Sequence, residues 1–158
     1  MIDKASANDE TIAKSLREAK LIYLLGGFLH YLGQTLKNSV AWKACLEAFE
    51  NGAVIAGSSA GAMVMCGILL RSVRRESSRR IRSGEQFARP AASNTFGNGW
   101  ASSLLKQIPS VTLIGIDEQT GMLKDGEHGM WNVYGAGEAT LYRKGRVKMY
   151  KVGNTFSV

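Results

Sequence analysis

The sequence predicts an α/β fold: a mostly parallel sheet flanked by helices on both faces, followed by a C-terminal β-hairpin. Three observations predict it. Short continuous apolar runs, typical of strands buried on both faces, alternate along the chain with segments of helical periodicity. That strand–helix order favours parallel strands joined by helices. Near the C-terminus, apolar and polar residues alternate around Lys144-Gly145, which indicates a hairpin.

The first half of the chain supplies two strand–helix units. The apolar run "LIYLL" ends at Gly26-Gly27, and helical spacing resumes after it until Asn38 and Ser39 break it. The predicted elements are, in order, a helix from Asn8 or Asp9 to about Lys20, a strand over 21–25, helices over 28–38 and 40–52, a strand over 53–57 and a helix over 60–70.

The second half is less regular. Residues 71–100 are predicted to form a mobile crossover, followed by a short helix near 101–107. "VTLIGID" (111–117) is a third buried strand, and the hairpin follows it. Because the sequence has neither internal repeats nor a linker, residues 1–158 are predicted to form a single domain.

Composition narrows the class of protein. Apolar residues make up 45% and charged residues 21% of the chain, which is ordinary for a globular domain. We expect no membrane association, because no apolar run is long enough to span a bilayer, and the polar N-terminus is unlike a secretory signal peptide. The two cysteines lack metal-ligand or redox spacing, so we expect reduced thiols in a cytoplasmic protein, with no metal and no cofactor.

The net charge of +7 is concentrated in one segment. Between Arg71 and Arg89 the chain carries seven arginines and only two glutamates. Three interpretations stay open: a solvated loop, a lid over a site, or a contact with a polyanion. No aromatic residue lies among the arginines before Phe87, so stacking on nucleic-acid bases is not indicated, and we expect no nucleic-acid partner.

The segment from Gly57 to Gly61, "GSSAG", is a G-x-S-x-G motif between a predicted strand and a predicted helix. Such a turn projects the central serine above the sheet edge and directs backbone N–H groups at the reacting atom. Serine is a poor nucleophile unless a base takes its proton. Ser59 is therefore a candidate nucleophile; alternatively, it caps the helix in an ordinary tight turn.

Three stretches together resemble the dipeptidase E/cyanophycinase family of serine peptidases: residues 26–64, "GIDEQTGML" and "VYGAGEATLY". The resemblance implies a flavodoxin-like fold similar to the class I glutamine amidotransferase domain. It also implies that Ser59 is the nucleophile and that the N–H groups of Gly27 and Ala60 form the oxyanion hole. Glu118 would support the catalytic base.

The chain departs from the family pattern in two ways. It begins at the helix before the first apolar run, so it resembles a short form that lacks N-terminal βα units. An open sheet edge or uncovered apolar face would then favour a homo-oligomer. Where the family has a histidine base this sequence has Thr95, and Gly99 and Ala101 fall near the positions of substrate-binding arginines.

Two histidines remain as candidates for the base. His30 follows the expected oxyanion loop closely enough to lie near Ser59, so it is the candidate base. His128, in "KDGEHGMW", is expected to be a surface residue of a hairpin-like turn. A base supplied by a second subunit is a third possibility.

These observations favour a serine peptidase-like hydrolase of the dipeptidase E type, cleaving small peptides. The alternative is a catalytically inactive family member that keeps the turn as a scaffold and acts as a ligand-binding or assembly protein. A polyanion binder acting through the arginine-rich segment is a third hypothesis. The intact motif favours the hydrolase, whereas the replaced histidine favours the inactive protein.

Overall fold

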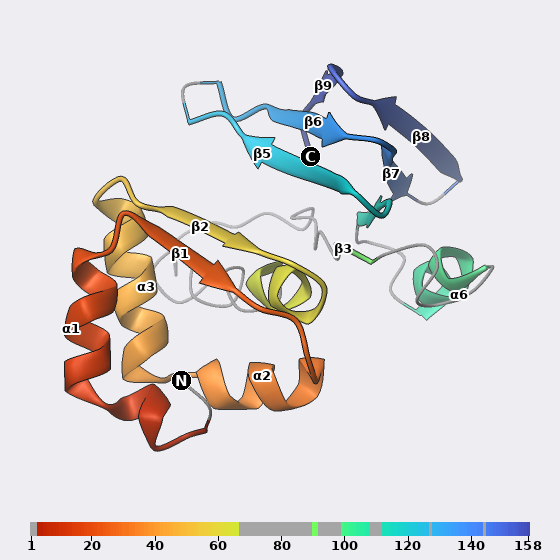
Figure 1. The fold of residues 1–158 in the computed structure, drawn as a ribbon. Helices are drawn as coiled ribbons and strands as arrows, with labels where there is room; N and C mark the ends of the chain where they lie inside the picture. The colour runs from red at the N-terminus through yellow and green to blue at the C-terminus, as the bar shows by residue number, and fades with distance from the viewer. Residues whose placement is uncertain (1–2, 67–89, 92–98, 108–111, 127, 144) are drawn as a thin grey trace, which may run out of the picture. The chain divides into compact units, whose positions relative to one another are not determined.

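The computed structural model describes residues 3–66, 90–91, 99–107, 112–126, 128–143 and 145–158 (Figure 1). The chain divides into two compact units, residues 1–69 and 70–158. Both helices and strands are present, and the predicted α/β class is confirmed at that level.

The first unit contains a two-stranded parallel sheet, with Leu21 opposite Val54 and Leu24 opposite Gly57. The predicted order of helices and strands is confirmed. Its elements are a 3₁₀ turn, η1 (Ser6–Asn8), then α1 (Glu10–Glu18), β1 (Leu21–Leu24), α2 (Leu29–Leu36), α3 (Val40–Glu50), β2 (Val54–Gly57) and a helical segment over 60–66.

Local sequence sets where these helices begin. The carboxylate of Asp9 accepts hydrogen bonds from the N–H groups of Thr11 (2.7 Å) and Ile12 (3.2 Å) at the start of α1. These bonds favour the charged form and lower the pKa of Asp9. Ser39 caps α3 from a buried position: its hydroxyl accepts from the N–H of Trp42 (3.1 Å) and donates to the carbonyl of Leu36 (2.9 Å).

Lys4, near the N-terminus of the chain, caps the C-terminal end of α2. The ammonium of Lys4 donates to the carbonyl oxygens of Gln34, Thr35 and Lys37 at 3.1, 3.3 and 2.8 Å. The last carbonyls of a helix have no partner within the helix, so a cation placed there satisfies them. This contact ties the start of the chain to the turn between α2 and α3.

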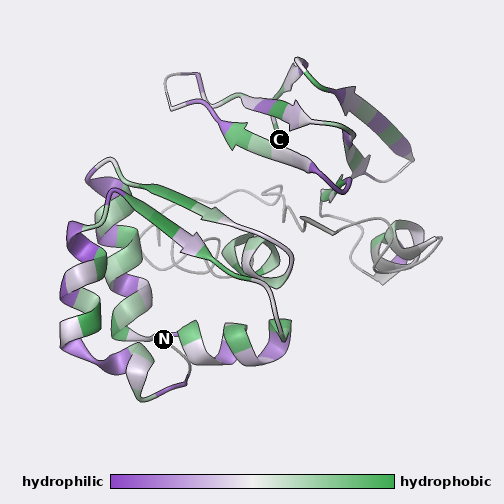
Figure 2. Cartoon of the chain, viewed as in Figure 1, coloured by the Kyte–Doolittle hydropathy of each residue, from purple (hydrophilic) through white to green (hydrophobic). Residues whose placement is uncertain are grey.

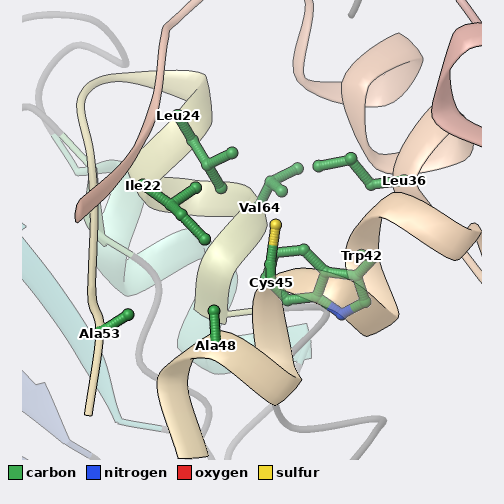
Figure 3. Packing of buried hydrophobic residues seen from close by; sticks show 8 residues of the cluster. All are labelled: Ile22, Leu24, Leu36, Trp42, Cys45, Ala48, Ala53 and Val64. Atoms are coloured by element: carbon green, nitrogen blue, oxygen red, sulfur yellow. The ribbon is translucent and has the colours of Figure 1, made fainter. Parts of the chain in front are cut away.

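The core of the first unit lies on one face of the β1–β2 sheet (Figure 3). Ile22 and Leu24 of β1 pack there against side chains of α2, α3 and the 60–66 segment, which are Leu36, Trp42, Cys45, Ala48 and Val64, and Ala53 adjoins them. Figure 2 shows that both strands are largely hydrophobic, whereas α1 is largely hydrophilic.

The expectation that both strands are buried on two faces is wrong for this unit. Leu21 and Tyr23 are 62% and 54% exposed, and Val54 is 45% exposed. Side chains along a strand point alternately to opposite faces, and the unit's helices cover only the face that carries Ile22 and Leu24.

Burial in this core raises the pKa of the Cys45 thiol to about 11, because desolvation disfavours the thiolate. In the unfolded chain the thiol ionises near its ordinary pKa of about 8.5. The folded state therefore holds the proton more tightly, and the stability that this provides is present below that pH and lost as the pH rises toward 11.

We predict that the free energy of unfolding falls by about 1 kcal/mol between pH 9 and 11 through this thiol. Denaturation of the parent and of Cys45→Val over that range measures it: the variant should lose this part of the decline. Cys66→Ala removes the other thiol, which is less buried, and should keep the decline. Equal slopes in the parent and Cys45→Val would contradict the prediction.

The second unit contains two sheets with the strand orders β3-β4-β7-β8 and β5-β6-β9. Its elements are β3 (Pro90–Ala91), α6 (Trp100–Gln107), β4 (Leu113–Ile116), β5 (Thr120–Lys124), β6 (Trp131–Gly135), β7 (Glu138–Arg143), β8 (Arg146–Lys151) and β9 (Thr155–Phe156). The helix near 101–107 and the hairpin around position 145 are confirmed, because β7 and β8 pair with Arg143 opposite Arg146.

The described strands do not form the predicted, mostly parallel sheet. Two strand pairs are parallel, β1–β2 and β3–β4, and the other four described pairs are antiparallel. Alternation of apolar and polar residues over 131–153 predicts one hairpin, and this prediction is wrong for its first part: β7 and β8 form the hairpin, whereas β6 pairs with β5 and β9 in a separate sheet.

Neighbouring residues of β4 point to opposite faces of its sheet. Leu113 packs with Ala101 and Leu105 of α6, whereas Ile114 packs with Val133 and Phe156 of the β5-β6-β9 sheet. One face of this sheet is thus covered by a helix and the other by strands, not by helices on both sides. None of the helices in the described ranges is both long and apolar enough to cross a membrane.

Candidate active site

Ser59 lies in a sharp turn between β2 and the helical segment that begins at position 60. Its φ angle is +49°, in the left-handed region that residues other than glycine rarely adopt. The N–H of Ser58 donates to the carbonyl of Leu24 at 3.1 Å, and the N–H of Met63 donates to the carbonyl of Ser59 at 3.0 Å. The strand–turn–helix arrangement that the motif predicts is therefore present.

The glycines of the motif are required by close backbone contacts. A Cβ atom on Gly61 would lie 2.1 Å from the carbonyl oxygen of Leu24, and one on Gly57 would lie 2.8 Å from the carbonyl carbon of Gly61. No real Cβ contact is that short, so the start of the helix packs directly on the end of β1. The two glycines hold Ser59 at the edge of the sheet.

The loop after β1 lies beside the serine. A Cβ on Gly26 would meet the Cβ of Ser59 at 3.0 Å and its Oγ at 3.4 Å. The next residue, Gly27, has a φ of +133°, which favours glycine. Gly26 was part of the glycine pair noted in the sequence, but its contact with Ser59 depends on the pairing of β1 with β2.

Ser59 is exposed, whereas Ala60 is 3% exposed. Within the part of the chain that the structure describes, the N–H groups of Gly27 and Ala60 donate to no acceptor. Ala60 also begins a helix, and the partial positive charge of a helix N-terminus stabilises a nearby anion. An accessible hydroxyl thus adjoins backbone donors that have no acceptor among the described residues.

His30 is the second residue of α2, three residues after Gly27, and it is exposed. Among the described residues, its ring forms no hydrogen bond with Ser59. His128 is exposed in the turn between β5 and β6, as expected, and its Nδ1 lies 3.1 Å from a carboxylate oxygen of Asp125.

Glu118 belongs to the second unit, in the turn between β4 and β5, and it is exposed. The turn around it is held by several hydrogen bonds. The carboxylate of Asp117 accepts from the N–H of Glu138 at 3.0 Å, and the hydroxyl of Thr120 accepts from the N–H of Gly137 at 2.9 Å. The same hydroxyl donates to the carbonyl of Glu118 at 3.1 Å.

The "GAG" segment, residues 135–137, packs closely against the turn that carries Glu118. A Cβ on Gly135, whose φ is +113°, would lie 2.1 Å from the carbonyl oxygen of Gln119, and one on Gly137 would lie 2.6 Å from the Cβ of Asp117. Asp117, which was not among the predicted site residues, fixes the turn that carries Glu118. The signal in the sequence was the pair of turn-favouring residues Asp117 and Thr120, whose short polar side chains can accept hydrogen bonds from nearby backbone N–H groups.

Thr95 and the arginine-rich segment 71–89 lie outside the described residues. Gly99, with a φ of +80°, precedes α6, and Ala101 is buried within that helix. In the described ranges, no cluster of three or more His, Cys, Asp and Glu side chains could hold a metal ion.

Comparison with known proteins gives two kinds of match. Residues 1–82 match the family described as Peptidase family S51. The structure of the chain is similar to a crystal structure of a peptidase from an acI-B1 Actinobacterium, with a TM-score of 0.74 and 28% sequence identity. That match covers 99% of this chain and 66% of the other, so this chain is about a third shorter.

A putative peptidase E protein from Listeria monocytogenes EGD-e is also similar, with a TM-score of 0.46 and 20% identity. The match covers 91% of this chain and 65% of that protein. No curated protein matches the chain with significance.

Proposed function

Because the chain belongs to peptidase family S51, as its resemblance to dipeptidase E indicated, we propose that it is a serine peptidase whose nucleophile is Ser59. The observation that carries the proposal is the backbone of this residue. Ser59 is exposed on a strand–turn–helix corner with a φ of +49°, a conformation that costs free energy unless the surrounding structure imposes it.

In the proposed reaction, Oγ of Ser59 attacks the carbonyl carbon of a peptide bond and gives its proton to a base. The N–H groups of Gly27 and Ala60 donate to the resulting oxyanion. The C–N bond then breaks, the amine leaves with the proton from the base, and an ester on Ser59 remains. Water hydrolyses this ester by the same steps and releases the acid.

We propose His30 as the base and Glu118 as the carboxylate that orients it. His30 is supported by its position in the first turn of α2, after the Gly26-Gly27 loop that contacts Ser59. Glu118 is supported by the hydrogen-bonded corner that presents it.

The substrate that we propose is a small peptide, and the site of action is the cytoplasm. A homo-oligomer is part of the same proposal. It is supported by apolar side chains that the first unit leaves exposed, among them Leu25 (74%) and Phe28 (87%).

Covalent labelling by a fluorophosphonate tests the nucleophile, with intact mass as the readout. The parent should gain one phosphonyl group, and Ser59→Ala should gain none. Ser58→Ala, which alters the neighbouring exposed serine, is the matched control and should label like the parent. Folded parent protein that resists labelling would overturn the enzyme proposal and leave the inactive scaffold as the better interpretation.

The same labelling assay tests the roles proposed for His30 and Glu118. If His30 is the base, His30→Ala should label at least about a hundredfold more slowly, because general bases contribute about 10²- to 10⁴-fold. Glu118→Gln should slow labelling less. Unchanged labelling of His30→Ala would exclude this histidine and leave the base to a second subunit or another side chain.

Gly26→Ala is predicted to slow labelling of Ser59 about tenfold, because a shift of a few tenths of an ångström misplaces the nucleophile. The added Cβ would meet the Cβ of Ser59 at 3.0 Å, so one of them must move. Gly121→Ala is a matched control: its Cβ would have no neighbour within 4 Å. Equal labelling rates in the two variants would contradict the prediction.

A further inference from the structure

β8 is the last strand in the order β3-β4-β7-β8, so among the described strands it has a partner, β7, on one side only (Figure 1). Five of its six residues are exposed, and Val147 and Met149 are each 65% exposed. An edge strand of this kind presents main-chain N–H and C=O groups with which another strand can pair. Which strand fits depends on where these groups point and on the side chains around them.

The alternation of the β7–β8 pair identifies the main-chain groups that β8 directs outward. In an antiparallel pair, successive residues direct their N–H and C=O groups alternately toward the partner strand and away from it. Lys151 directs both groups away from β7, because its N–H donates to the Oδ1 of Asn154 at 3.0 Å and its carbonyl accepts from the N–H of Asn154 at 2.9 Å. Met149 and Val147, two and four residues earlier, therefore have the same orientation. Within the described part of the chain, these two residues form no main-chain hydrogen bond outside the β7–β8 pair.

The side chains of β8 are positively charged on one face and apolar on the other. Arg146 and Lys148 are two residues apart and so share a face, whereas Val147 and Met149 share the opposite face. The strand carries no carboxylate, and among the described residues neither Arg146 nor Lys148 forms an ion pair. The edge thus combines outward main-chain groups with positive charge at every second position and apolar surface between.

A second copy of β8 does not fit this edge. The antiparallel register that uses the outward groups of Val147 and Met149 in both copies pairs these two residues with each other, and it places Lys148 opposite Lys148. Like charges directly opposite each other destabilise a strand pair, and charged edge residues protect proteins against such self-pairing. A strand of opposite charge meets the same groups without this cost.

We propose that β8 binds an extended segment of another protein in which acidic and apolar side chains alternate, and that the segment adds to the sheet as an antiparallel strand. Its main chain pairs with the outward groups of Val147 and Met149, and its apolar side chains cover these two residues. Its carboxylates face Arg146 and Lys148, so charge complementarity selects the partner. The proposal goes beyond the peptidase function and does not depend on it, because β8 and Ser59 belong to different units.

The peptide acetyl-Thr-Val-Glu-Val-Glu-amide tests the proposal in a titration of the ¹⁵N-labelled full chain. It should shift the amide signals of β8 saturably at millimolar concentration. At saturation, solvent exchange of the Val147 and Met149 amides should slow several-fold, because they become hydrogen-bonded, whereas the Lys148 amide, which already points toward β7, should change little. The absence of a saturable shift, or a shift without this alternating protection, would overturn the proposal.

Two N-methylated forms of the peptide separate strand pairing from charge. Methylation of both valine nitrogens removes the N–H groups that donate to β8 and keeps the negative charge, so this form should not bind. Methylation of both glutamate nitrogens changes N–H groups on the outer edge of the added strand, so this form should keep most of the affinity. Equal binding by the two forms would show that β8 attracts any polyanion, and the proposed strand pairing would be wrong.

Lys148→Glu should weaken binding of the acidic peptide about tenfold, because a carboxylate then faces a glutamate. The same variant should bind acetyl-Thr-Val-Lys-Val-Lys-amide more tightly than the parent does, a gain that a misfolded variant would not show. Lys124→Glu is the matched control: it makes the same charge change at an exposed position of β5, in the other sheet of this unit, and should alter either affinity less than about twofold. Identical behaviour of the two variants would mean that only net charge matters and would refute the proposal.

Discussion

Gly61→Ala is expected to lower the stability of the first unit by about 3 kcal/mol and to abolish labelling of Ser59. The new Cβ would lie 2.1 Å from the carbonyl oxygen of Leu24, which is backbone and cannot rotate away. The start of the helix and the end of β1 must separate, and Ser59 moves with them. Hydrogen exchange of the β1 and β2 amides measures the loss within this unit.

Gly33→Ala is the matched control for this substitution. Gly33 lies inside α2, and its added Cβ would meet only the Cγ2 of Val64, at an ordinary contact distance of 3.6 Å. Alanine favours a helix over glycine by about 0.5 to 1 kcal/mol, so this variant should be slightly more stable than the parent. Helix propensity alone would predict the same gain for Gly61→Ala, and a gain there would refute the close contact.

Ser59→Gly is expected to raise stability by about 1 kcal/mol while it eliminates labelling, because glycine adopts the left-handed region without the cost that a Cβ brings. Ser59→Ala keeps the Cβ and its strain and removes only the hydroxyl. Comparing these two variants therefore isolates the backbone strain. Hydrogen exchange of amides near the turn measures the change in stability, and intact mass measures the labelling of Ser59.

A result in which Ser59→Gly is no more stable than Ser59→Ala would show that the turn holds no strain at this residue. A gain in stability together with lost labelling would instead mean that the strained conformation is kept for its hydroxyl. Stability would then be traded for function, as often happens at active sites.

Local sequence was enough to locate the helix starts and the serine corner. Asp9 and Ser39 cap their helices through hydrogen bonds to residues two or three positions away. The glycines around Ser59 indicate a tight turn because close backbone approach leaves no room for a Cβ. These features depend on neighbours in the chain, so a single sequence carries them.

The sheets of the second unit could not be predicted in the same way. Trp131 pairs with Lys124 on one side and with Phe156 on the other, so β6 joins strands that are far apart in sequence. Alternation of apolar and polar residues identifies a strand but not its partner. For this reason the hairpin predicted from the alternation wrongly includes β6, whose partners are β5 and β9.

By itself, the sequence determined the α/β class, the order of elements in the first unit, the family and the position of the candidate nucleophile. Only the tertiary structure decided that β1 is buried on one face, that Gly26 contacts Ser59 and that Asp117 fixes the turn of Glu118. Each of these depends on which segments pack together. Packing partners are set by long-range pairing of strands and helices, which no local pattern of residues encodes.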